Sequence, residues 1–342
     1  MVLFTLLFHL QNTHETQVAH LQGKFKAICH QAEENPTVMF PLPRDYRGQV
    51  PISFSISFKP KAALVKGKTY ATPTGDQIAE FTLRPMKRGD IVEIEWKSDV
   101  YTRSVERFQP PESVPFPESY PEDVQAWLKP SRFVDSDHPE IVKKAAEYKS
   151  DNVMKTINNV VVGCVDIGSK QKGQAREMSA SIALKTNGSC TSNANLMAAL
   201  LRANRIPARI LSGYPTWFKG PYQTHYIVEA YVPGFGWYPI ESTMYAQGWP
   251  CNSMPIVSIV SIENENKGKE RLNGGGGVAY LSLTETSAGL LARGSFTETF
   301  SDHKASLDKN LITVDTRIWG EAQKRWAEWL NRTREAWLDL ED

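Results

Sequence analysis

The sequence has few cysteines, and their arrangement argues against two kinds of small scaffold. Only four occur in 342 residues, at Cys29, Cys164, Cys190 and Cys251. They form no CxxC pair and follow no regular spacing, so neither a disulfide framework nor a structural zinc site is expected. The sequence therefore predicts free thiols, with no metal and no cofactor.

An excess of charge of either sign is also lacking. The 39 lysine and arginine residues nearly cancel the 38 aspartate and glutamate residues, leaving a formal net charge of +1. This balance gives no electrostatic case for nucleic acid or an anionic membrane as the main partner. No stretch approaches the ~20 apolar residues of a membrane-spanning helix. We expect no integral membrane span, and the oligomeric state stays open.

The apolar N-terminal stretch lacks the marks of a secretory signal. MVLFTLLFHL, residues 1–10, has no lysine or arginine before its apolar run, and the first lysine or arginine of the sequence is Lys24. A clear small-residue cleavage site is missing as well. Residues 1–36 are therefore expected to form an N-terminal segment, and both a cytoplasmic and a secreted location stay open.

Residues 37–108 have the pattern of β-strands. In VPISFSISFKP, residues 50–60, every second residue from Ile52 to Phe58 is apolar. DIVEIEWK, residues 90–97, repeats this alternation, and turn residues separate the runs. Alternation at period two indicates half-buried strands. We predict a small antiparallel β-sandwich.

Composition divides the rest of the chain. Five prolines in residues 109–123 exclude a helix or a central strand, so this stretch is expected to be a linker. A core domain is expected over residues 124–300 and a helical tail over 301–342. In the tail, Trp319, Trp326 and Trp329 recur at helical spacing. A docked C-terminal helix is the favoured interpretation of that stripe.

Cys190 stands where a helix is predicted to begin. It follows the turn sequence Asn-Gly-Ser, and apolar residues then recur at helical spacing from Leu196 to Leu201. Unpaired N–H groups and the helix dipole stabilise a thiolate there by a fraction of a kcal/mol to ~2 kcal/mol. Cys190 is thus a candidate nucleophile, and a small buried residue is the alternative.

Two further residues could complete a catalytic set. His225 opens the strand-like run HYIVEAYV, and Glu241 lies in the next one, GWYPIEST. They are 16 residues apart, and a hairpin at PGFG would bring them together across two strands. An imidazole can accept the thiol proton near neutral pH, and a carboxylate can hold its tautomer.

These residues resemble the motifs of the transglutaminase-like superfamily of cysteine enzymes. The likeness covers roughly residues 120–260, and looser similarity extends to the N-terminal β-domain. The matching pieces are Gly188-Ser189-Cys190, Arg205-Ile206-Pro207-Ala208-Arg209, Gly213-Tyr214, His225-Tyr226, and Trp237 through Glu241-Ser242-Thr243. Two positions depart from the family pattern: Arg205 replaces the usual glycine, and Glu241 replaces the usual aspartate.

The resemblance implies an α+β fold of papain-like type, in which the helix carrying Cys190 packs on an antiparallel sheet. It also implies acyl transfer, with Cys190 attacking an amide carbonyl, His225 moving the proton and Glu241 orienting the imidazole. The N–H of Cys190 and one upstream donor would meet the oxyanion. Candidates for that donor, by composition only, are Trp127, Asn152 and Asn187.

The acceptor that takes the acyl group stays open at this stage. Water would make the protein a peptidase or amidase acting on a peptide or protein, whereas a primary amine would make it a protein-glutamine acyltransferase. No DxDxDG-type loop supports calcium dependence. An inactive domain that binds peptide or protein is a further alternative, and removal of asparagine-linked glycans is a weaker one.

Overall fold

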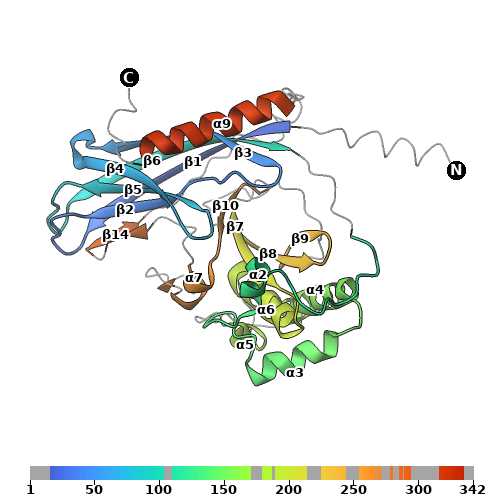
Figure 1. The fold of residues 1–342 in the computed structure, drawn as a ribbon. Coiled ribbons are helices and arrows are strands. Elements are labelled where there is room, and N and C mark those ends of the chain that lie inside the picture. Colours follow the sequence, from blue (N-terminus) through green and yellow to red (C-terminus); the bar gives the residue numbers. More distant parts are fainter. Residues whose placement is uncertain are drawn as a thin grey trace.

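The computed structural model of the chain describes residues 16–103, 110–170, 179–186, 189–213, 225–243, 254–267, 269–270, 278–279, 285–287, 289–293 and 316–334. Its architecture is mixed: antiparallel sheets come first, a helical core with its own sheet follows, and a helix comes last (Figure 1). This confirms the predicted α+β class.

Two four-stranded antiparallel sheets form the N-terminal β-sandwich. One sheet has the strand order β14-β1-β6-β3, and the other has the order β13-β2-β5-β4. These strands, with the 3-10 turn η1 after β3, are β1 (Thr16–Cys29), β2 (Thr37–Pro41), β3 (Gln49–Lys59), η1 (Lys61–Ala63), β4 (Leu64–Ala71), β5 (Gln77–Leu83), β6 (Ile91–Arg103), β13 (Glu285–Thr286) and β14 (Leu290–Arg293). The alternation of the sequence is retained in β3, where Phe54 and Phe58 are buried and the serines between them face solvent.

A cluster of aromatic residues fills the space between the two sheets. Phe25 and Phe40 pack with ring centroids 5.1 Å apart, and Phe58 lies 5.3 Å from Phe81. Gly23 is required on β1, because a Cβ there would lie 2.3 Å from the indole of its cross-strand neighbour Trp96. Burial of these rings stabilises the sandwich.

The sandwich extends beyond the residues expected for it. Strand β1 lies inside the stretch expected as an N-terminal segment, yet it pairs with β6 along its length from Thr16 to Ile28. Strands β13 and β14, inside the range expected for the core domain, pair with β2 and β1. Strands β13 and β14 are bound there because β2 and β1 would otherwise expose unpaired backbone groups at the edges of the two sheets.

Helix α9 (Thr316–Thr333) covers the side of the sandwich where β3 and β4 lie (Figure 1). Trp326 and Leu330 are buried in the aromatic cluster, and Trp326 stacks on Trp329 with centroids 4.7 Å apart. The hydroxyl groups of Thr333 and Thr69 lie 2.9 Å apart. The prediction of a docked C-terminal helix is therefore confirmed, whereas Trp337 lies outside the described residues.

The proline-rich linker packs against the core domain. Val114 is buried in the core cluster, and its carbonyl accepts a hydrogen bond from the N–H of Val153 at 2.8 Å. The Asn152 amide donates to the Glu112 carbonyl at 2.8 Å. The described part of the linker contains no regular strand, but helix α2 (Glu122–Gln125) begins within its last two residues, so the expected absence of a helix holds only up to Pro121.

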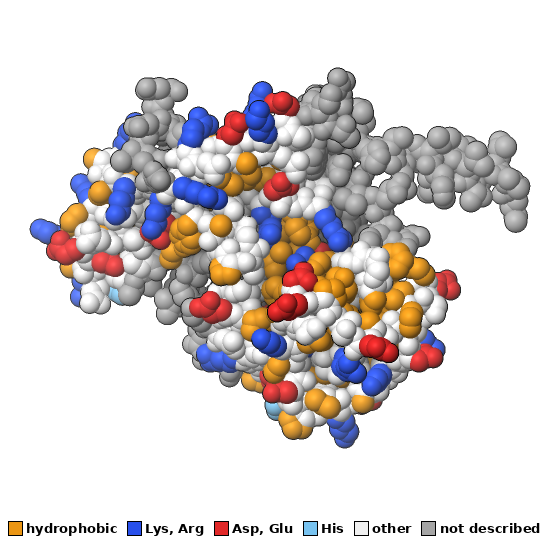
Figure 2. Space-filling model, in the orientation of Figure 1, with side chains coloured by type: hydrophobic (Ala, Val, Ile, Leu, Met, Phe, Trp, Pro, Cys, Tyr) orange, Lys and Arg blue, Asp and Glu red, His pale blue; other side chains and the backbone are white. Residues whose placement is uncertain are grey.

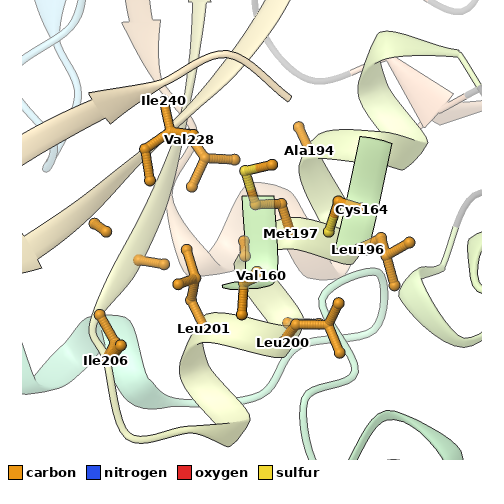
Figure 3. Packing of buried hydrophobic residues seen from close by; sticks show 14 of the residues in the cluster. Val160, Cys164, Ala194, Leu196, Met197, Leu200, Leu201, Ile206, Val228 and Ile240 are labelled. Carbon is orange, nitrogen blue, oxygen red and sulfur yellow. The ribbon is translucent and has the colours of Figure 1, made fainter. Parts of the chain in front are cut away.

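Helix α6 (Cys190–Ala203) is the centre of the core domain. Leu196, Leu200 and Leu201 are fully buried, and the helix packs on α4 (Val153–Lys170) and on the sheet (Figure 3). The helices around it are α3 (Pro139–Tyr148), α5 (Ala180–Ala183), α2 (Glu122–Gln125), η2 (Ala126–Leu128) and α7 (Ile262–Lys267). This burial explains why residues 196–201 follow helical spacing in the sequence.

The core sheet is antiparallel, with the strand order β10-β7-β8-β9. Its strands are β7 (Ala208–Gly213), β8 (His225–Val232), β9 (Gly236–Ile240) and β10 (Ile256–Ile259), and a separate pair is formed by β11 (Lys269–Glu270) and β12 (Val278–Ala279). The hairpin predicted at PGFG joins β8 to β9, with Gly234 and Gly236 at positive φ.

Buried polar contacts join the sandwich to strand β10. The Gln49 side chain donates to the Ile256 carbonyl and accepts from the Ile256 N–H, both at 2.7 Å. The Asp76 carboxylate accepts bonds from the Ser258 hydroxyl at 2.9 Å and from the Ile259 N–H at 3.0 Å. Because these groups are buried, the two halves are held together by bonds that are costly to leave unmade.

On the face drawn in Figure 2, lysine and arginine side chains lie among aspartate and glutamate side chains over both halves of the molecule. This mixture agrees with the near-zero net charge of the sequence. Among the described residues, no helix is long and apolar enough to cross a membrane.

Candidate active site

Cys190 is the first residue of helix α6, as predicted. Ser189 precedes it in extended conformation, with φ −78° and ψ 175°. The side chain of Cys190 is partly buried, whereas those of Thr191 and Ser192 are buried. A side chain at this position lies beside N–H groups that no helical carbonyl satisfies, so negative charge on it is stabilised.

His225 is the first residue of β8 and pairs with Gly213 of β7. Gly213 must be glycine, because a Cβ there would lie 2.5 Å from the carbonyl oxygen of Pro255. The chain before β10 therefore crosses close to the residue opposite His225. Because of this close approach, the segment with Met254 packs on the core sheet, and the Met254 side chain is buried there.

Glu241 follows directly after β9 and is fully buried. Its Oε2 atom lies 2.7 Å from Nε2 of His225. Its Oε1 atom accepts the backbone N–H of Thr243 at 2.8 Å and the Thr243 hydroxyl at 2.6 Å. A carboxylate only accepts, so Nε2 carries the proton and Nδ1 is the ring nitrogen left for another partner.

That partner is the thiol of Cys190, and its effect appears in the pKa of His225. Burial lowers this pKa, but hydrogen bonds from the ring to Cys190 and Glu241, with the negative charges on both, outweigh burial and raise the pKa from 6.5 to about 9. These interactions favour the protonated imidazolium form of His225, held between the sulfur of Cys190 and the carboxylate of Glu241.

The structure thus brings the three predicted residues together. Glutamate has one more methylene than the aspartate usual at this position, yet the carboxylate of Glu241 lies 2.7 Å from Nε2 of His225. Arg205, the other departure from the family pattern, has φ +63°. That is the left-handed region, which explains why glycine is usual at this position.

The described candidates for the upstream oxyanion donor have other contacts. The Asn152 amide donates to Glu112, and its oxygen caps α4 by accepting the N–H of Lys155 at 3.2 Å. Trp127 packs edge-to-face on Trp237 with centroids 6.2 Å apart. Asn187 lies outside the described residues.

Sequence reasoning assigned no role to Ser242 and Thr243. Thr243 holds the carboxylate of Glu241 with two donors. Ser242 is fully buried, and its hydroxyl lies 3.0 Å from the carbonyl oxygen of Tyr226. The available signal was a hydroxyl residue two positions after an acidic one, since short polar side chains near such turns bond locally to the backbone.

The other two cysteines that the structure describes do not take part in this group. Cys29 and Cys164 are buried, and burial raises the pKa of both thiols. An inert core thiol is the expected behaviour in such surroundings. Cys251 lies outside the described residues. Within the described part of the chain, no three His, Cys, Asp or Glu side chains form a metal-binding group.

Comparisons with known proteins place this site in a family context. Residues 139–242, which include all three residues of the group, match the model of the transglutaminase-like superfamily. No curated protein matches the chain.

A solved structure from Cytophaga hutchinsonii, described as a "Putative Cysteine Protease", has a TM-score of 0.54 to this chain. It is 20% identical, and the match covers 84% of this chain and 94% of the other, which shows a shared fold. A second, from Parabacteroides distasonis and described as a "putative protease", has a TM-score of 0.25 and 14% identity over 67% of this chain and 47% of its own, too low to support an argument.

Proposed function

We propose that this chain, whose residues 139–242 match the model of the transglutaminase-like superfamily, is a cysteine hydrolase that cleaves amide bonds of a peptide or protein. One observation carries the proposal: the ring of His225 is hydrogen-bonded both to the Cys190 thiol and to the buried Glu241 carboxylate. A nucleophile, a base and an orienting group in contact are what acyl transfer needs.

In the proposed first step, the thiolate of Cys190 attacks the amide carbonyl and a carbon–sulfur bond forms. The imidazolium of His225 then gives its proton to the departing nitrogen as the carbon–nitrogen bond breaks. An amine leaves, and the acyl group stays on Cys190 as a thioester. The N–H of Cys190 at the start of α6 would stabilise the oxyanion of the tetrahedral intermediate.

In the second step, neutral His225 takes a proton from water, and the oxygen attacks the thioester carbonyl. The carbon–sulfur bond breaks, the acid is released, and the thiolate–imidazolium pair is restored. Glu241 keeps Nε2 protonated throughout, so that Nδ1 serves as the exchanging nitrogen. Burial of Glu241 supports this role, because its charge acts in a region of low dielectric.

The test is cleavage profiling with a mixture of peptides from a digested proteome, comparing the full chain with its Cys190→Ala variant. We expect new peptide ends with the active chain only, and a hydroxamate of the acyl group when hydroxylamine is added. Iodoacetamide should label Cys190 at pH 6, a label that the variant lacks. Peptide ends that form equally with Cys190→Ala would overturn the proposal.

The same preparation separates hydrolysis from amine transfer. Casein is incubated with a fluorescent primary amine and either protein. Casein that becomes fluorescent only with the active chain would identify a protein-glutamine acyltransferase in place of a hydrolase. A chain that labels at Cys190 yet neither cleaves peptides nor transfers the amine would point to a binding domain.

A further inference from the structure

Ser242 lies where the pairing of β8 and β9 ends. The last paired residues are Val228 and Ile240, so continuing the register would place Ser242 opposite Tyr226. The strand stops instead, and the Ser242 hydroxyl donates to the Tyr226 carbonyl at 3.0 Å. A side chain thus takes the place of a backbone bond at the strand end, next to His225.

The same hydroxyl reaches the first turn of α6. Its oxygen lies 3.4 Å from the carbonyl oxygen of Cys190. A hydroxyl has a single hydrogen, so it is shared between the carbonyls of Tyr226 and Cys190 as a three-centre bond. One of these carbonyls belongs to the residue that carries the thiol, and the other belongs to the neighbour of the residue that carries the imidazole.

Full burial makes this link consequential. Ser242 has no solvent-exposed surface, so water does not replace the hydroxyl if it is removed. The carbonyl of Tyr226, itself a buried residue, would then lose this hydrogen bond, and the loss of a buried hydrogen bond is unfavourable. The link that this hydroxyl makes between the helix start and the strand end would be lost.

We infer that Ser242 is a positioning residue that fixes the distance between the Cys190 sulfur and the His225 ring by tying the backbones of α6 and β8 together. The inference rests on the proposed function and adds a residue that acts through two others. Proton transfer and attack depend steeply on distance, and a misplacement of about 1 Å can lower a rate about 100-fold.

The test measures the thiol directly and does not require a substrate. Alkylation of Cys190 by iodoacetamide is followed from pH 5 to pH 10 by mass spectrometry of the peptide that contains it. For Ser242→Ala we expect the rate near pH 7 to fall about tenfold, with the midpoint of the pH profile displaced. Where peptide cleavage is found, kcat should fall about 10- to 100-fold while KM changes less than about twofold.

Two variants separate positioning from stability. Ser258→Ala removes another buried serine of the core sheet, one that bonds Asp76 at 2.9 Å. It should lower the melting temperature without changing the alkylation profile. Ser242→Thr keeps the hydroxyl and should restore at least half of the lost rate, and it serves as the comparison with the wild type if Ser242→Ala does not fold.

A Ser242→Ala protein that alkylates Cys190 at the wild-type rate and with the wild-type profile overturns the inference. So does a change in Ser242→Ala that Ser258→Ala reproduces in full. If the wild type cleaves no peptide, the proposed function fails, whereas the alkylation result still decides whether Ser242 positions the thiol.

Discussion

Among the described residues, two histidine–carboxylate pairs are almost identical in length but differ in exposure and in surroundings. In the sandwich, His20 and Asp99 lie opposite each other on β1 and β6, with Nδ1 and Oδ1 2.6 Å apart. In the core domain, His225 and Glu241 make a contact of 2.7 Å. The sandwich side chains are 53% and 44% exposed, whereas those of the core are 15% and 0% exposed.

Their surroundings explain why only one pair is a candidate for catalysis. Asp99 has the Ser53 hydroxyl at 3.2 Å, on the exposed face of a sheet. Glu241 has two donors from Thr243 on one oxygen and the imidazole on the other, and that imidazole also contacts a thiol. In water the attraction within an ion pair is weak, whereas burial strengthens it. A short contact alone therefore says little about function.

Replacing each histidine in turn gives the largest expected contrast. His225→Gln should lower kcat for peptide cleavage by about 10⁴-fold or more, because the thiol loses its base. His20→Gln, the matched change in the exposed pair, should leave kcat within about twofold. Both are measured as initial rates on one peptide found by the profiling experiment. A His225→Gln protein with a tenth of the wild-type activity would remove the distinction between the pairs.

Replacing each carboxylate by its amide should have a smaller effect. The N–H and hydroxyl of Thr243 both donate to Oε1 of Glu241. In Glu241→Gln the amide oxygen must take that position, so the NH₂ group faces His225. Nε2 then has to accept, and Nδ1 carries the proton, which prevents it from taking one from the thiol. We expect kcat to fall about 10²- to 10³-fold.

The same substitution should lower the pKa of His225 from about 9 toward the ordinary 6.5, because the charge and the acceptor of Glu241 are both lost. The pKa is read from the imidazole proton signals of wild type and variant by nuclear magnetic resonance. Asp99→Asn is the control and should change neither kcat nor the His225 titration. An unchanged pKa in Glu241→Gln would show that Glu241 does not govern the ring.

The helix, the hairpin and the three residues of the group could be predicted because each has a local signal. The spacing from Leu196 to Leu201 and the turn at residues 233–236 belong to single elements. Family motifs then supplied the order of Cys190, His225 and Glu241. The contact between His225 and Glu241 could be predicted from the hairpin, because a hairpin places its two strands side by side.

The edge strands of the sandwich, and the contacts of Ser242 and Thr243, could not be predicted from local sequence signals. Strand β13 has two residues, and it pairs with β2 almost 250 residues earlier. So short a segment has no periodicity, and its partner is set by the open sheet edge. The Ser242 hydroxyl reaches a carbonyl 52 residues away. By contrast, β1 alternates buried Leu21, Phe25 and Ala27 with polar residues, so its signal was present in the sequence.

The smallest expected effect is on stability, and its sign follows from the pKa of His225. The pKa of the folded state, about 9, lies above the ordinary value of 6.5, so the folded chain binds more protons between these pH values. The stabilisation is therefore fully present below pH 6.5 and is lost as the pH rises through 9. Its upper bound is of order 3 kcal/mol, since one pH unit corresponds to about 1.4 kcal/mol.

Unfolding by guanidinium at pH 6, 7.5 and 9.5 measures this contribution. The free energies of unfolding of wild type and variants are compared at each pH, so that groups which titrate alike in all the proteins cancel. The free energy of unfolding should fall with pH more steeply in the wild type than in Glu241→Gln, by up to about 3 kcal/mol across the range. His20→Gln, the change in the exposed pair, should alter the free energy of unfolding by less than about 1 kcal/mol at each pH. If the curves of wild type and Glu241→Gln run parallel while that of His20→Gln does not, the exposed pair is the one coupled to folding, and the raised pKa of His225 does not depend on Glu241.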